Sequence, residues 1–188
     1  MAWRLLCLLA ALTWLTPATA AEPIPPMAGL SAAAASTRAA LFAELAATKS
    51  NAEARAVEDR LCTFWRGLGD ETSLRLLKTA EDAQLEFDYG RALDALREMV
   101  AHQPDFAEGW NRLAYALFLA NSQDAALEAL DRAIALEPMH YAALAGKGII
   151  LWQQGKEAEM QAPLKRALAI DPWLKERNLI GTAPQPMP

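Results

Sequence analysis

The chain has 188 residues, of which 53% are hydrophobic and 22% charged, and its 18 basic and 23 acidic residues give a net charge of −5. This mild acidity, with the charges scattered along the chain, argues against nucleic acid and an anionic membrane surface as partners. The length is enough for one domain with a continuous core.

Residues 1–20 have the layout of a secretory signal peptide. Arg4 precedes an apolar run over residues 5–15, and a small-residue cleavage site ends at Ala20. The run is shorter than the roughly 20 apolar residues that a membrane-spanning helix needs. We therefore expect cleavage after Ala20, a periplasmic or secreted protein, and membrane contact only through the transient signal peptide. The alternative is a retained membrane anchor.

Cysteine usage fits a fold that is stabilised by packing alone. Cleavage of the signal peptide removes Cys7 and leaves Cys62, so no disulfide can form within the chain. Cys62 lies between Leu61 and Phe64 on the apolar side of a predicted helix. We interpret it as a small buried hydrophobic residue. Pairing with a cysteine of another chain is the alternative.

Two kinds of segment follow the signal peptide. Residues 21–37 are rich in proline and alanine and predict an extended linker. Residues 38–69 predict a helical hairpin, with a first helix near 38–49 and a second helix that begins after Ser50 and ends at Gly67. The second helix carries apolar side chains at helical spacing, namely Val57, Leu61, Trp65 and Leu68. We expect this hairpin to pair with the segment that follows it.

The rest of the chain repeats at a fixed interval. Pro104, Pro138 and Pro172 are evenly spaced, with a period of about 34 residues, and each ends one predicted helix. Between them, small residues mark the first helix of each predicted pair and leucines mark the second; these are Ala80, Ala114, Gly148, Leu130 and Leu164. A helix pair of this length cannot bury its apolar face alone, so neighbouring pairs must stack.

The residues between the prolines resemble the tetratricopeptide repeat family. The motif positions of the middle unit are filled by Trp110, Leu113, Ala114, Leu117, Ala126, Leu130, Ala133 and Pro138. The resemblance implies three units, at about 73–106, 107–140 and 141–174. It also implies an all-α, right-handed solenoid. The hairpin precedes this solenoid, a short capping helix over residues 173–180 follows it, and residues 181–188 form a loose tail. With its signal peptide, the chain looks like a small exported repeat protein of Gram-negative bacteria.

No catalytic or metal-binding arrangement stands out in the sequence. His102 and His140 lie at the junctions between units, without cysteines or carboxylates at ligand spacing, and are predicted loop residues. Phosphate-binding glycine loops and nucleophile motifs are absent from the sequence. We therefore expect no enzyme activity, no cofactor and no metal.

The family resemblance also implies a binding surface. In this family the first helix of each unit lines a concave groove, and alignment places there Asn111, Tyr115, Phe118, Ala145, Ile149 and Trp152. Such an apolar and aromatic groove suits an amphipathic helix or an extended peptide. The alternative is that the N-terminal hairpin covers the aromatic side chains and makes them core residues. Leu77, Glu81, Ala142 and Gly146 replace the residues with which some family members clamp a C-terminal carboxylate.

The expected function follows from this groove. We expect a non-catalytic adaptor or assembly factor that holds a peptide or helical segment of another envelope protein. The alternative is a structural subunit of a homo-oligomer that uses the same apolar face to associate.

Overall fold

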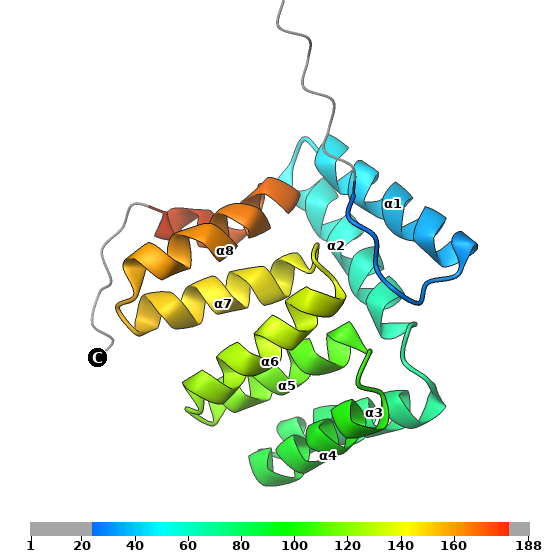
Figure 1. The fold of residues 1–188 in the computed structure, drawn as a ribbon, viewed down its shortest axis with the longest axis vertical. Helices are drawn as coiled ribbons and strands as arrows, with labels where there is room; N and C mark the ends of the chain where they lie inside the picture. The colour runs from blue at the N-terminus through cyan, green and yellow to red at the C-terminus, as the bar shows by residue number, and fades with distance from the viewer. Residues whose placement is uncertain (1–23, 181–188) are drawn as a thin grey trace, which may run out of the picture.

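The computed structural model describes residues 24–180, which form eight α-helices and one 3-10 helix (Figure 1). The helices are α1 (Ala32–Ala47), α2 (Asn51–Arg66), α3 (Glu71–Leu85), α4 (Tyr89–His102), α5 (Ala107–Leu119), α6 (Gln123–Leu136), α7 (Tyr141–Gln153), α8 (Glu157–Ile170) and η1 (Lys175–Leu179). The described part contains no strand, so the predicted all-α fold is confirmed. None of the described helices is long and apolar enough to cross a membrane.

Helices α3 to α8 form three stacked antiparallel pairs, as the spacing of the prolines predicts. The two helices of each pair approach closely where the first helix carries a small residue. Ala80 and Ala114 occupy two of these positions and are almost completely buried. At Gly148, a Cβ atom would lie 3.2 Å from the Cβ of Leu164, so this position leaves little room for a side chain. The small residues therefore set the separation of the helices within each pair.

The turn inside each pair has the same backbone geometry. Phe87, Asn121 and Gly155 occupy equivalent positions in the three units and have positive φ angles of 60°, 58° and 71°. In each turn the next residue donates its N–H to a carbonyl five residues back, which is the Schellman ending of a helix. Glycine and asparagine adopt this conformation readily, whereas it costs phenylalanine about 1 kcal/mol.

The N-terminal hairpin does not simply extend this stack. Helices α1 and α2 lie across one end of it, so that α1 contacts α8 and α2 contacts α5 (Figure 1). Leu45, Leu61 and Trp65 of the hairpin form one apolar cluster with Tyr141 at the start of α7, and Trp173 packs against this cluster. The prediction that the hairpin pairs with the segment after it was therefore incomplete. Its apolar face is covered by residues that lie far away in the sequence.

A buried ion pair fixes α1 to the end of α6. Arg38 donates to both carboxylate oxygens of Glu137, at 2.6 and 2.5 Å, and both side chains are buried. Glu137 also accepts hydrogen bonds from the Met139 N–H and the Trp65 indole N–H. The remaining guanidinium nitrogen Nη1 of Arg38 donates to the Pro25 carbonyl. Each buried charge is thus paired and hydrogen-bonded, as burial requires.

The N-terminal boundary differs from the predicted one. Helix α1 begins at Ala32 and is capped by Ser31, inside the segment 21–37 that was predicted as an extended linker. The alanines after Ser31 are strong helix formers, which explains the earlier start. Ile24 packs against the hairpin cluster, so the described part of the linker is not free of contacts. The predicted signal peptide 1–20 and tail 181–188 lie outside the described residues.

Candidate binding groove

A cavity of about 800 Å³ opens between α2, α5, α7 and the C-terminal segment around η1. Helix α2 and residues 173–178 form its walls, and α5 and α7 form its floor. Its floor residues include Ala142, Ala145, Gly146 and Ile149 of α7, which leave the surface smooth and apolar. Arg55, Glu58, Arg112 and Arg177 place both signs of charge around it.

Five of the six groove residues expected from the sequence lie around this cavity. They are Asn111, Tyr115, Phe118, Ala145 and Ile149. Tyr115 is 55% exposed, and Phe118 is half-buried. The hairpin contributes a wall of the groove and leaves Tyr115 uncovered. The sequence left open whether the groove is open or covered by the hairpin, and at Tyr115 the structure agrees with an open groove.

Trp152, the sixth groove residue expected from the sequence, does not line the cavity, so that assignment is wrong. Its half-buried indole packs against a separate cluster that contains Leu151, Met160 and Leu164, together with Leu179 of η1. The C-terminal segment brings Leu179 to the end of α7, and a repeat motif gives no information about that segment. Trp152 is therefore a packing residue between α7 and α8.

His140 lies in the connection between α6 and α7, as its position between units predicted, and its side chain is buried. It caps α7, with Nδ1 accepting a hydrogen bond from the Ala143 N–H. Its Nε2 atom lies 3.0 Å from an Oε2 atom of Glu108. Its ring stacks on Trp65 of α2, with the ring centroids 4.1 Å apart. His140 thus joins α5 and α7 to the hairpin beneath the groove.

Glu108 is the buried anion of this arrangement. It accepts hydrogen bonds from Arg112 at 2.5 Å and from Asn111 at 3.1 Å, besides its contact with His140. Burial raises its pKa, but the His140 and Arg112 contacts outweigh burial and lower the pKa to about 2. Glu108 therefore stays ionised at neutral pH, and its partners occupy both of its oxygens. These bonds suit a structural role, since a general base needs a free oxygen.

Cys62 lies on the α2 wall of the cavity and is only partly buried. Burial, followed by the nearby Glu108 carboxylate, raises the pKa of its thiol. The thiol is therefore protonated and weakly nucleophilic at neutral pH. Cys62 was predicted to be buried and is half-buried instead, while an unreactive role agrees with the surroundings of the thiol.

Two carboxyl groups meet at the edge of the groove, where sequence reasoning found none. Glu58 of α2 lies beside Asp171, which follows α8 and is fully buried. Burial, and then the Asp171 charge, raise the pKa of Glu58 to about 7. Asp171 accepts a hydrogen bond from the Trp173 N–H through one oxygen, while its other oxygen has no hydrogen-bond donor. A proton shared with Glu58 would satisfy this second oxygen.

Metal ligands are not grouped within residues 24–180. No set of three or more histidine, cysteine, aspartate or glutamate side chains there could hold a metal ion.

Comparisons with known proteins identify similar sequences and folds. No family model matches the chain. A "TPR repeat-containing protein" of Rhizobium etli is 30% identical over 132 residues, which cover 70% of this chain. The matched region spans 65% of the length of that relative.

Three solved structures share the arrangement of helices. The TPR2B domain of yeast Sti1, in complex with an Hsp70 peptide, has a TM-score of 0.54 at 20% identity and covers 59% of this chain and 91% of its own. The MamA protein has a TM-score of 0.50 at 16% identity and covers 80% of this chain and 92% of its own. A Thermobaculum terrenum O-GlcNAc transferase has a TM-score of 0.50 at 26% identity over 54% of this chain, but only 19% of the transferase is covered.

Proposed function

We propose that this chain, which belongs to the tetratricopeptide repeat family, holds a peptide segment of a partner protein in the groove between α2, α5, α7 and η1. Proteins of this family generally act as non-catalytic scaffolds for protein–protein interaction. The observation that carries the proposal is Tyr115, an aromatic side chain that is 55% exposed on the floor of a cavity of about 800 Å³. Exposed aromatic anchors in a concave site are the residues that dominate binding energy.

The lining of the groove indicates which segments fit. Its floor of small and aliphatic side chains, Ala142, Ala145 and Ile149, accepts apolar side chains of a helix or an extended peptide. Groups of both signs of charge line the groove, so a segment of strong single-sign charge is not favoured. At the positions where some family members clamp a C-terminal carboxylate, this chain carries Leu77, Glu81, Ala142 and Gly146. An internal apolar segment is the ligand that this surface fits best.

We further propose that the chain works in the periplasm as an adaptor or assembly factor. The support is the sequence of residues 1–20, with its apolar run and small-residue cleavage site. Secretion of a reporter fused after Ala20, and N-terminal sequencing of the product, test this part. Retention of the reporter in the cytoplasm would contradict it.

Crosslinking at the groove floor tests the binding proposal. A photoreactive amino acid at position 115 should crosslink a discrete partner in cells, and Ile149→Glu should remove that product because it places a charge on the apolar floor. Phe87→Asn is a matched control, since Phe87 is exposed on the distant turn edge and its loss should leave the crosslink unchanged. An equal yield of crosslinked product in Ile149→Glu, with folding intact, would contradict the groove as the binding site.

A further inference from the structure

Helix η1 buries an acidic side chain at the groove and keeps its basic side chains exposed. Glu176 lines the cavity, and only 8% of its surface is exposed. Lys175 and Arg177 on either side of it are exposed, and Leu179, the one apolar residue of this helix, is only half-buried. A surface helix normally turns its apolar residues inward and its charged residues toward solvent. Glu176 reverses this arrangement.

The other buried carboxylates of the described chain show what such a group needs. Glu137 accepts two hydrogen bonds from Arg38. Glu108 accepts one from Arg112, and Asp171 accepts one from a backbone N–H. A carboxylate that loses its water without gaining a donor is destabilised, so burial requires such partners. In these three cases the fold itself supplies them.

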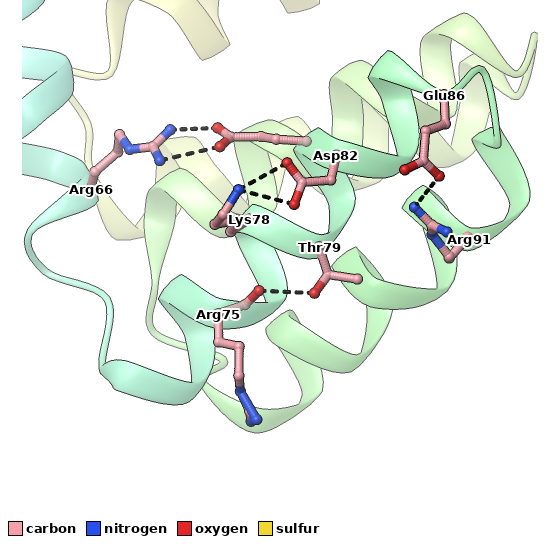
Figure 2. A network of polar contacts seen from close by, with 8 residues as sticks. Arg66, Arg75, Lys78, Thr79, Asp82, Glu86 and Arg91 are labelled. Carbon is pink, nitrogen blue, oxygen red and sulfur yellow. Dashed lines mark hydrogen bonds and ion pairs between the residues drawn. The ribbon is translucent and has the colours of Figure 1, made fainter.

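The fold supplies no comparable partner to Glu176. Its ionic contact within residues 24–180 is with the neighbouring Lys175, whose Nζ atom lies 4.0 Å away and whose side chain is 91% exposed. No donor of the described residues lies within hydrogen-bond distance of its carboxylate. By contrast, Glu86 and Arg91 form an ion pair at 2.7 Å on the surface of the first helix pair, where water alone would satisfy both charges (Figure 2). The folding of the isolated chain therefore does not account for the burial of Glu176.

The basic side chains around the groove do not take this place. Arg112 is held by Glu108. Arg55 and Arg177 are exposed and donate to a side-chain amide oxygen and a backbone carbonyl. Their charges are screened by solvent and salt, so they repel a basic group in the groove only weakly. The Glu176 charge lies in the wall of the groove, where attraction to an incoming cation is less screened.

We propose that the segment held in the groove carries a lysine or arginine side chain that binds Glu176, next to apolar side chains that contact the floor. This inference rests on the proposed function, because it names the chemistry of the segment that the groove holds. A cationic group suits the site better than a neutral amide, since a charge-assisted hydrogen bond to a carboxylate is the stronger of the two. Glu176 thereby sets the register of the segment in the groove, because the basic residue must lie beside it.

Selection from a library of short random peptides tests the proposal. The wild-type protein should enrich peptides that combine apolar residues with a lysine or arginine. These peptides should not bind Ile149→Glu, which places a charge on the groove floor. Glu176→Gln should raise the dissociation constant of an enriched peptide at least about tenfold. Replacing the basic residue of the peptide by glutamine should weaken binding to the wild type equally and have little further effect on Glu176→Gln.

Two controls separate this contact from folding and from general charge effects. Glu98→Gln changes an exposed carboxylate on α4, which does not line the cavity, and should leave the dissociation constant unchanged. Glu176→Gln should melt at the same temperature as the wild type or higher, because it removes a buried charge that has no hydrogen-bond donor. A lower melting temperature would assign Glu176 to the fold and overturn the proposal.

The outcomes distinguish this inference from the proposed function. Peptides that are lost in Ile149→Glu but carry no basic residue would overturn the inference and leave the proposed function intact. Equal dissociation constants for wild type and Glu176→Gln would have the same meaning. A library that yields no peptide sensitive to Ile149→Glu would contradict the proposed function itself, and this inference with it.

Discussion

The Glu58 carboxyl group links the charge state of one residue to the stability of the fold. Its ordinary pKa of 4.5 rises to about 7 in the folded chain, first through burial and then through Asp171. At a pH between these two pKa values, Glu58 holds a proton in the folded chain and has released it in the unfolded chain. Stability therefore falls as the pH rises from about 4.5 to about 7. Glu108 acts in the opposite sense, because its lowered pKa costs stability as the pH falls from 4.5 toward 2. Stability should be highest in mildly acidic solution.

Glu58→Gln should remove most of the loss of stability between pH 5 and pH 7. The amide does not titrate and can donate a hydrogen bond to Asp171 at every pH, whereas the wild-type pair loses its proton. Solvent screens the partly exposed Glu58, so we expect the free energy of unfolding of the wild-type protein to fall by only about 1 kcal/mol over this range, and that of the variant to change much less. Denaturant unfolding at a series of pH values measures both. Asp171→Asn, which removes the other carboxylate, should flatten the profile in the same way. A pH dependence that is identical in wild type and Glu58→Gln would contradict the role of this pair.

At the scale of the elements, the N-terminal hairpin is held on the stack by polar groups as well as apolar ones. Arg38 and Glu137 are 99 positions apart and meet in a fully buried ion pair. Desolvation offsets much of the attraction in such a pair, so its net contribution to stability is small. Removing one partner is a different matter, because the other charge is then left buried without compensation. The pair therefore determines where the hairpin docks.

Single and double substitutions should separate these two effects. Arg38→Leu should lower the free energy of unfolding by about 3–5 kcal/mol, since Glu137 then keeps a buried and poorly compensated charge. Arg38→Leu combined with Glu137→Leu should be less destabilising than the sum of the two single substitutions. Denaturant unfolding of the four proteins gives the coupling energy. As a control, Arg60→Leu breaks an exposed pair with Glu44 and should cost about 1 kcal/mol or less, the value for surface pairs. Additive effects at Arg38 and Glu137 would show that the pair does not act as a unit.

The same elements show what the sequence could predict. Helices α3 to α8 follow from the repeat period, because each turn and each close helix contact is encoded within its own unit, as at Asn121 and Gly148. Most of the groove floor follows too, since family positions on α5 and α7 face one side of the stack. The walls could not be predicted, because the docking of α2 and of residues 173–178 depends on contacts between distant segments. Trp152 was misassigned for that reason, and the burial of the His140 side chain was not foreseen. The Arg38–Glu137 contact carries no local signal that would reveal it.

On the scale of the whole molecule, segments that lie far apart in the sequence form the two walls of the groove. One wall is α2 and the other is the C-terminal segment over residues 173–178. Trp65 is the central contact: it is buried, stacks on His140 of the stack and lies 5.5 Å from Tyr141 between ring centroids. The Asn51 amide also reaches the Trp173 carbonyl, at 3.4 Å, so α2 contacts the C-terminal wall. The hairpin, the stack and the C-terminal segment should therefore unfold together in the intact protein.

Trp65→Ala should break this cooperativity. Loss of the indole leaves a large cavity between the hairpin and the stack and removes the ring that covers His140, at a cost of about 3–5 kcal/mol. In a repeat array, each pair depends mainly on its neighbours, so α3 to α8 can retain their structure while α1 and α2 open. Native-state hydrogen exchange should then show fast exchange in 32–66 and continued protection in 107–153. Trp65→Phe keeps most of the packing and should exchange like the wild type. If Trp65→Ala instead exchanges uniformly across all helices, the hairpin is an inseparable part of one folding unit, and the groove cannot open by its release.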